Sequence, residues 1–270
     1  MTGKRTGMFK KCVKYAIIGL VLIFMYVPIL ILAVYSFTDS PNIGAIHSFS
    51  FHNYVTLFTT PELIDMIIGA IGSAVLATIL GTTGAIGAFY SKKNVNGTMS
   101  VLNQIPVVNA DVVTGFSLCI LLVVVFGVSK NTYIPLVIGH TVLSAPFVYL
   151  AVVPKLKQMD PSLYEAALDL GATPGYTLIH IIIPQIASGI ISGFVMAVTL
   201  SLDDYFVATY TKPATFDTIS TYVVNATKGS QTNIRTALWA LSTIIFLIVV
   251  IVEVVMNFAP IKNEAQKEKH

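Results

Sequence analysis

The stretch DPSLYEAALDLGATPGYTLIHIIIP at residues 160–184 carries the strongest structural signal in this chain. Asp160 can cap a helix that has Pro161 in its first turn, where a missing backbone N–H costs little. Gly171 supplies a turn, and Thr173 can then cap a second helix with Pro174 behind it. We therefore expect two short helices that meet at a sharp bend. Their apolar side would consist of Tyr164, Ala167, Leu168 and Leu178.

The composition places this bent unit in a membrane protein. Of the 270 residues, 55% are hydrophobic and 11% are charged, whereas soluble domains carry about 25% charged residues. Six stretches are long enough for the ~20 residues that span a bilayer. Four carry no charge, at 16–38, 66–91, 131–154 and 181–202, and the stretches at 94–129 and 236–261 are interrupted only by Asp111 and Glu253. We predict an all-α polytopic membrane protein with six transmembrane helices. Their expected positions are about 15–38, 62–90, 99–127, 135–154, 185–207 and 234–258.

Basic residues determine the predicted orientation, because short cytoplasmic segments hold an excess of Lys and Arg. With the N-terminus inside, 12 of the 16 Lys and Arg residues are cytoplasmic, and Lys130, Lys212, Lys228 and Arg235 lie outside. We therefore expect two cytoplasmic ends, at 1–14 and 261–270, with 262–270 disordered. The domain at 15–260 would include a cytoplasmic loop at 155–184. Anionic lipid accounts for the positive charge better than nucleic acid does.

The first hydrophobic stretch follows a basic segment, as a secretory signal does. At over twenty residues it is longer than a usual signal core, and no clear small-x-small cleavage site follows it. We therefore expect it to remain as the first spanning helix. Cys12 is predicted at the inner face of the membrane and Cys119 inside the third span, so neither lies in an oxidising compartment, and the two are not at metal-ligand spacing. We therefore predict two free thiols and no metal site.

Two other patterns predict packing. Small residues recur at four-residue spacing along the second span and would let a neighbouring backbone approach closely. They are Gly69, Ser73, Ala77, Gly81 and Ala85. Aromatic residues follow the first span and suit a helix at the membrane interface. They are Phe49, Phe51, Tyr54 and Phe58.

The loop at 160–184 resembles the EAA loop of binding-protein-dependent ABC-transporter permeases. That pattern is EAA, a glycine four residues after the last alanine, and a terminal hydrophobic-x-hydrophobic-Pro. This chain has EAA at 165–167, Gly171 and IIIP at 181–184. The resemblance implies a type I ABC importer permease whose loop sits in a groove of a cytoplasmic ATPase subunit. The residues it assigns to coupling are Tyr164, Glu165, Ala166, Ala167, Leu168, Gly171, Ala172, Thr173 and Pro184.

No G-x-x-x-x-G-K-[ST] segment occurs in the sequence. GATPGYT at 171–177 lacks the lysine that would reach nucleotide phosphates. We therefore expect a transport subunit rather than an enzyme, with no cofactor of its own. ATP and Mg²⁺ would be bound by partner ATPase chains.

Asp111 lies inside the third predicted span, where a charge costs at least ~2.5 kcal/mol and is by default a functional candidate. At helical spacing it shares a polar stripe that suggests a water-lined path. The other members of the stripe are Asn103, Gln104, Thr114 and Ser117. A purely structural role is the alternative.

Asp203 and Asp204 lie near the outer end of the fifth span, and we expect both to point into the bundle. With Tyr205 after them, they would suit an amine cation through charge pairing and cation–π contact. The alternatives are a helix-terminal pair that faces outer water and a hydrogen-bonded structural pair. Trp239 would line the same path or belong to the outer aromatic belt.

Three segments resemble spermidine/putrescine permeases, most of all the PotC-type subunit. They are TLSLDDYFVATYT at 199–211, ISTYVV at 219–224 and ALSTIIFLIVVI at 240–251. This resemblance implies a heterodimer with a second permease subunit, two ATPase subunits and an extracytoplasmic polyamine-binding protein. It also implies that the protein lies in the bacterial cell membrane and transports its substrate by alternating access.

Three further polar residues are not expected to contact the substrate. His140 is expected to be a hydrogen-bonded packing residue rather than a proton relay, and His180 to lie on the loop surface. Glu253 is expected to snorkel or to pair with a lysine.

Competing functions are an ion-coupled secondary transporter or channel, which would use the intramembrane carboxylates without ATP, and a non-transport scaffold. An ABC permease for another small solute is a further alternative. An anionic solute would require basic residues inside the membrane, and the six hydrophobic stretches contain none; Arg235 and Lys262 lie just beyond the ends of the last one.

Overall fold

The computed structural model of the chain describes residues 2–38, 48–160, 162–228 and 232–267. The described residues form helices and connecting turns, with a single isolated bridge between Thr38 and Phe49. This confirms the all-α class. The chain divides into two compact units, one made of Met1–Thr60 with Ala226–Ile248 and the other of Pro61–Asn225 with Val249–His270.

The first unit contains α1 (Thr2–Ser36), α2 (His52–Thr59) and the beginning of α13 (Thr232–Lys267). Buried Asn53 ties α2 to the end of α1, because its amide donates to the backbone carbonyls of Ser36 and Thr38, each at 3.0 Å. The predicted short helix after the first span is thus present as α2.

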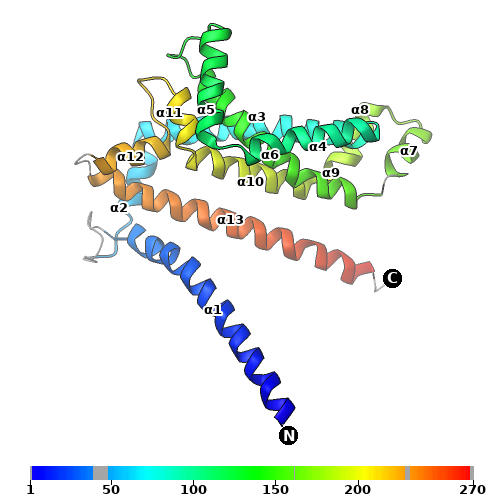
Figure 1. Ribbon diagram of the computed structural model, residues 1–270, viewed down its shortest axis with the longest axis horizontal. Helices are drawn as coiled ribbons and strands as arrows, with labels where there is room; N and C mark the ends of the chain where they lie inside the picture. Colours follow the sequence, from blue (N-terminus) through cyan, green and yellow to red (C-terminus); the bar gives the residue numbers. More distant parts are fainter. Residues whose placement is uncertain (1, 39–47, 161, 229–231, 268–270) are drawn as a thin grey trace. The chain divides into compact units, whose positions relative to one another are not determined.

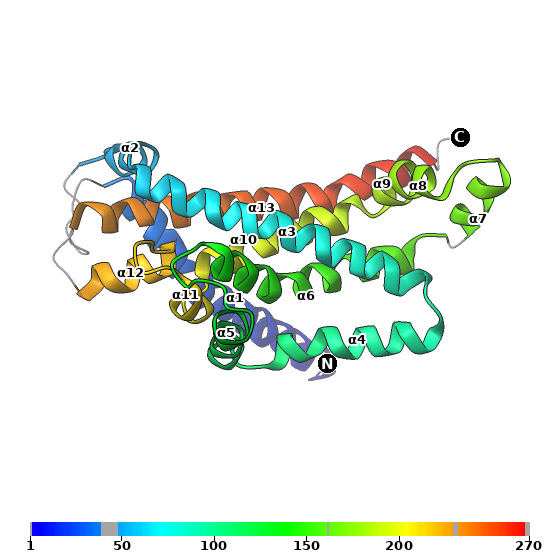
Figure 2. The ribbon, with the colours of Figure 1, turned by 90° about the horizontal axis from the view of Figure 1, so that it is seen from above.

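The core of the second unit is formed by α3 (Pro61–Tyr90), α6 (Ile134–Gln158) and α10 (Ala187–Asp203), which lie side by side in Figure 1 and Figure 2. A Cβ on Gly81 would lie 2.7 Å from both the Ala145 carbonyl oxygen and the Val148 Cβ. A Cβ on Gly193 of α10 would lie 3.0 Å from Val148 Cγ1. The predicted ridge of small residues is therefore a close-packing surface against α6.

Among the described residues, three helices are long and apolar enough to cross a bilayer: Val13–Ser36, Pro61–Tyr90 and Ile134–Gln158. Two bent pairs of helices pass the same test when each pair counts as one span. A shorter apolar helix, Thr236–Val252, corresponds to the sixth predicted span. All six predicted stretches are therefore helical, although two of them are bent.

The third predicted span is not one continuous helix. It consists of α4 (Lys93–Val108), α5 (Asp111–Cys119) and the π-helix η1 (Ile120–Val125), with a bend of 101° between the α4 and α5 sides. Pro106 weakens the last turn of α4, and Asn109 and Ala110 adopt extended backbone angles. The single polar stripe predicted through Asp111 is therefore wrong, because its members lie on two differently directed helices.

Other boundaries also differ from the prediction. The fifth span bends by 73° near Ile186, and α10 ends at Asp203 rather than near residue 207. The following chain forms α11 (Phe206–Thr211) and α12 (Ile219–Lys228). At the two ends of the chain, α1 begins at Thr2 and α13 continues through Lys267. The expectation of a disordered tail is therefore wrong for 262–267, and 268–270 lie outside the described residues.

Candidate functional site

The loop between α6 and α10 folds into the bent helical unit that the sequence predicts. Its first helix is α7 (Ser162–Asp169) and its second begins as α8 (Pro174–Thr177). The chain then continues through η2 (Leu178–Ile182) and α9 (Ile183–Gln185) to α10. Figure 1 shows α7 and α8 at one end of the second unit and α5 and α11 at the opposite end.

Local hydrogen bonds hold the two helix starts of this loop. The backbone N–H and the hydroxyl of Ser162 donate to Asp160 Oδ1 at 2.9 Å and 2.7 Å. These bonds, the backbone one first, hold the pKa of Asp160 below its ordinary value because they favour the carboxylate. The Thr173 hydroxyl accepts from the backbone N–H of Tyr176 at 3.4 Å. Both predicted caps are therefore formed.

Gly171 makes the bend between the helices possible. Its φ of +84° lies in the left-handed region that L side chains rarely adopt. The N–H groups of Gly171 and Ala172 donate to the carbonyls of Leu168 and Ala167 at 2.9 Å and 3.0 Å. This is a Schellman ending, which satisfies the last carbonyls of α7 and turns the chain toward α8.

One side of α7 is fixed against the membrane helices. Ala167 is buried, and the Tyr164 ring lies 4.9 Å from that of Tyr90 at the end of α3. Tyr164 and Leu178 also pack against the core of the second unit. The predicted apolar side of the loop thus contacts α3 and the core.

The other side of the loop is exposed. Glu165 and Ala166 are exposed on α7, and Leu170 is 89% exposed at its end. Thr173 and Pro184 are exposed as well, and Ala172 is half-buried. His180 is on the loop surface as predicted, stacked 4.2 Å from Tyr176. The loop therefore presents a carboxylate and an apolar side chain outward while its opposite side is anchored.

A cluster of buried polar side chains lies in the second unit, and its members were not predicted to be neighbours. His140 of α6 is 2% exposed, and its Nδ1 lies 2.7 Å from the hydroxyl of Ser201 on α10. Its Nε2 lies 3.3 Å from Asp204 Oδ2, an ion-pair distance without hydrogen-bond alignment. The hydrogen-bonded packing role expected for His140 is consistent with these contacts, and its partners are Ser201 of α10 and Asp204, the residue that follows α10.

Asp204 also organises the chain after α10. Its Oδ1 accepts from the N–H of Val207 at 3.1 Å and its Oδ2 from the N–H of Ala208 at 2.8 Å, which caps α11. The Ser220 hydroxyl donates to the Asp204 carbonyl. α10 ends at Asp203, and the carboxylate of the next residue, Asp204, accepts hydrogen bonds from the first turn of α11.

The candidate substrate-path residues fall into different surroundings. Asp204 is buried and Asp203 is exposed, so the expectation that both carboxylates point into the bundle is wrong for Asp203. Asp111 is exposed in the first turn of α5, and Tyr205 is half-buried. Trp239 belongs to the first unit, where its buried ring packs edge-on against Tyr35 at 5.8 Å.

Of the two cysteines, the structure describes the side chain of one. Cys119 is a free thiol, as expected. The side chains of Cys12 and Glu253 lie outside the described part of the structure. Among the described residues, no group of three or more His, Cys, Asp or Glu is arranged to hold a metal ion.

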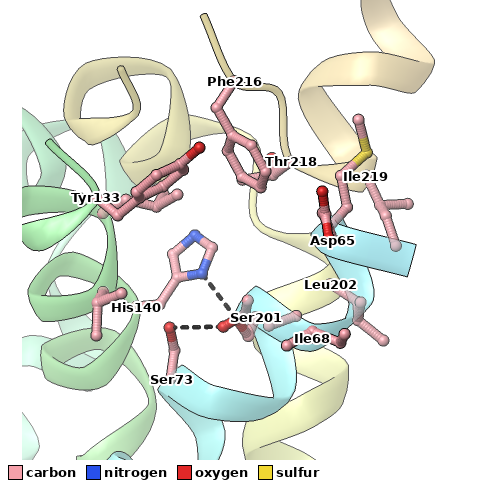
Figure 3. A pocket seen from close by; sticks show the side chains of 15 residues that line it. Asp65, Ile68, Ser73, Tyr133, His140, Ser201, Leu202, Phe216, Thr218 and Ile219 are labelled. Atoms are coloured by element: carbon pink, nitrogen blue, oxygen red, sulfur yellow. Dashed lines mark hydrogen bonds between the residues drawn. The ribbon is translucent and has the colours of Figure 1, made fainter. Parts of the chain in front are cut away.

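Near the buried cluster, a cavity of about 360 Å³ opens between α3, α6, α10 and the segment before α12. Figure 3 shows His140 and Ser201 at its base, with Tyr133 and Phe216 above them and Asp65 to one side. The rings of Tyr133 and Phe216 are 5.1 Å apart, edge to face. The sequence contained one usable signal for the buried cluster, because Ser201 and Asp204 are three residues apart, a spacing that predicts side chains on the same side of a helix.

The apolar helices and the anchored, outward-facing loop define a multi-pass membrane transport subunit. The chain belongs to the family described as binding-protein-dependent transport system inner membrane component, whose model matches residues 82–259. This family supplies the transport subunit of ABC importers and is not catalytic.

Curated relatives extend over most of the chain. It is 32% identical over 201 residues to the putrescine transport system permease protein PotI of Escherichia coli (strain K12), covering 69% of this chain and 70% of that protein. It is 29% identical over 248 residues to the spermidine/putrescine transport system permease protein PotC of Haemophilus influenzae, covering 89% and 93%. The predicted resemblance to polyamine permeases is confirmed.

Solved structures confirm the fold. A bacterial ABC transporter involved in the import of the acidic polysaccharide alginate matches with a TM-score of 0.61 at 20% identity, covering 94% of this chain and 96% of that chain. The alginate transporter in complex with a pentasaccharide-bound periplasmic protein matches with a TM-score of 0.58 at 18% identity, covering 95% and 93%. The fold is that of a type I importer permease.

Proposed function

We propose that this chain is one permease subunit of an ATP-driven importer that moves polyamines such as putrescine and spermidine into the cell. The loop at 160–184 carries the proposal, because it is anchored on one side and exposes Glu165 and Ala166 on the other. The names of the relatives PotI and PotC support the choice of substrate.

The proposed coupling step is mechanical. α7 follows directly after α6, and Tyr164 packs on Tyr90 at the end of α3. A force applied to α7 by an ATPase subunit would therefore reach two core helices at once. Because packed helices transmit strain rather than absorb it, closure of the ATPase would shift the bundle between inward- and outward-open states.

The proposed assembly contains a second permease subunit, two ATPase subunits that bind ATP and Mg²⁺, and an extracytoplasmic polyamine-binding protein. This chain would bind no nucleotide and no cofactor. Lys155 and Lys157 lie in the last turn of α6, beside the loop. Their position supports a cytoplasmic loop and cytoplasmic termini in the bacterial inner membrane.

The structure changes which carboxylates we assign to the substrate path. Asp204 is committed to His140 and to the N–H groups of α11. Asp111 and Asp203 are exposed on this subunit and so are available to a path shared with the second permease. Tyr205 and Trp239 stay assigned to that path as proposals.

The test is purification of the chain with its partner subunits, followed by reconstitution in liposomes. We expect ATPase activity and uptake to rise when the binding protein is loaded with putrescine or spermidine, and not with an unrelated solute. The chain without partners should transport nothing. Transport by the chain alone would establish an ion-coupled transporter or channel instead, and stimulation by the unrelated solute alone would remove the polyamine assignment.

A further inference from the structure

The cavity above His140 has the surroundings that a protonated amine requires. Asp65 of α3 is the carboxylate in its lining, and none of the described lining residues is Lys or Arg. The negative side chain and the absence of basic ones select for cations over anions. At about 360 Å³, its volume lies near the lower end of the ~300–1,000 Å³ range of small-molecule sites.

Two aromatic rings add a second element of cation recognition. Tyr133 and Phe216 form the edge-to-face pair over the cavity, and Figure 3 shows them on the side opposite Ser201. A cation near the face of such a ring gains about 0.5–2 kcal/mol, the larger value where water is excluded. Lys212 helps to hold Phe216, since its ammonium donates to the Phe216 carbonyl at 3.1 Å and lies 3.0 Å from Asp217.

The buried imidazole of His140 is also part of the lining. His140 Nε2 has no aligned hydrogen-bond partner, and its contact with Asp204 is the 3.3 Å ion-pair distance. A buried polar group without a full partner costs free energy. Figure 3 shows the imidazole at the base of the cavity, beneath Phe216 and Tyr133.

Most of the remaining lining is apolar, with Met66, Leu136, Val137 and Leu202 among its members, and its polar exceptions are Ser73, Ser201 and Thr218. Such a surface suits methylene groups rather than a hydrated metal ion. The ligand that fits is therefore an ammonium group on an alkyl chain. The ammonium would lie beside Asp65 and the two aromatic rings, and the alkyl chain would lie along the apolar wall.

We propose that this cavity is a binding site for one alkylammonium end of the transported substrate, with Asp65 as its counter-charge and Tyr133 and Phe216 as its aromatic wall. The proposal rests on the proposed function and specifies where this subunit contacts the substrate. It places the contact at residues that the sequence did not single out, rather than at Asp204.

The test uses the purified complex with its partner subunits and without the binding protein. Binding of 1,4-diaminobutane is measured by equilibrium dialysis, with the uncharged 1,4-butanediol as competitor. We expect Asp65→Asn to weaken binding about tenfold, as loss of a charge-assisted contact does. Phe216→Leu and Tyr133→Leu should each weaken it about threefold or more, whereas Tyr133→Phe keeps the ring and should bind like the wild type.

Glu62→Gln is the matched control, because Glu62 lies in the first turn of the same helix but is outside the cavity lining. Its affinity should stay within about twofold of wild type, and butanediol should not compete. Equal affinities of the wild type, Asp65→Asn and Phe216→Leu would overturn the proposal, as would competition by butanediol or no binding to the wild-type complex. If the wild-type importer takes up polyamines in liposomes while these results are negative, only this inference fails; if it takes up none, the proposed function fails.

Discussion

The Oδ2 atom of Asp204, the residue that follows α10, lies 3.3 Å from Nε2 of His140 in the second turn of α6, inside the second unit. The same carboxylate accepts the N–H groups of Val207 and Ala208. A buried charge is tolerated where it is paired and hydrogen-bonded. These contacts account for a carboxylate in this apolar bundle without a substrate.

Replacement of Asp204 should therefore destabilise the protein. Asp204→Ala leaves two buried N–H groups without an acceptor, at about 1–3 kcal/mol for each unsatisfied group. Asp204→Asn should be milder because its amide oxygen can still accept one bond. We expect the melting temperature of the purified complex to fall in the order wild type, Asn, Ala.

Asp203→Asn is the matched control for this series, because Asp203 is the adjacent residue but is exposed. Its effect on stability should be within about 0.5 kcal/mol, as for most surface substitutions. Uptake by the Asp204 variants should fall in step with the amount of folded complex. If both Asp204 variants melt at the wild-type temperature but lose uptake, Asp204 would have to be assigned to the substrate path instead.

The bent loop could be predicted from the sequence because its determinants are local. Asp160, Gly171 and Thr173 each act on backbone groups within five residues. The helices of the spans could also be predicted, because an apolar stretch long enough to cross a bilayer is expected to be helical. The four-residue spacing of small residues also identified the surface of α3 that packs on α6, because Gly81 meets Val148 there.

The buried cluster could not be predicted in the same way, because His140 and Ser201 are 61 residues apart and come together only through packing of α6 on α10. The break in the third span was missed for another reason. Pro106, Asn109 and Asp111 are ordinary helix stop and start signals, but they lay within a hydrophobic stretch that was long enough to span. Apolar length does not distinguish a straight helix from a bent pair.

Gly171 should be required for the loop geometry. A side chain at φ +84° is strained, by about 1–2 kcal/mol for most residues. We expect Gly171→Val to lower ATPase activity stimulated by the loaded binding protein. Gly171→Asn should retain more of it, because asparagine tolerates left-handed angles better. No atom would crowd a Cβ at this position, so equal activity of Val, Asn and wild type would show that the bend does not matter for coupling.

Glu165 should matter for coupling rather than for folding, because it is exposed on α7. Glu165→Lys is expected to reduce ATP-driven uptake at least tenfold, since a charge reversal in a docking surface costs over about 1.4 kcal/mol. Asp169→Lys is the matched control, an exposed carboxylate one turn along the same helix. Both variants should melt like the wild type. Uptake that falls equally in both would reflect general charge rather than a contact of Glu165.

Gly81 provides a test of the packing that connects the loop to the rest of the second unit. A Cβ there would meet the Ala145 carbonyl and the Val148 side chain at 2.7 Å, closer than real Cβ atoms come, so α3 and α6 must move apart. Overpacking of this kind costs about 1–3 kcal/mol, and Gly81→Ala should lower the melting temperature of the complex. Gly72→Ala on the same helix meets nothing within 4 Å. Since alanine favours a helix over glycine by about 0.5–1 kcal/mol, that variant should melt at or above the wild-type temperature. If the two variants shift the melting temperature by the same amount and in the same direction, helix propensity rather than close approach governs this face, and the role assigned to the small-residue ridge is wrong.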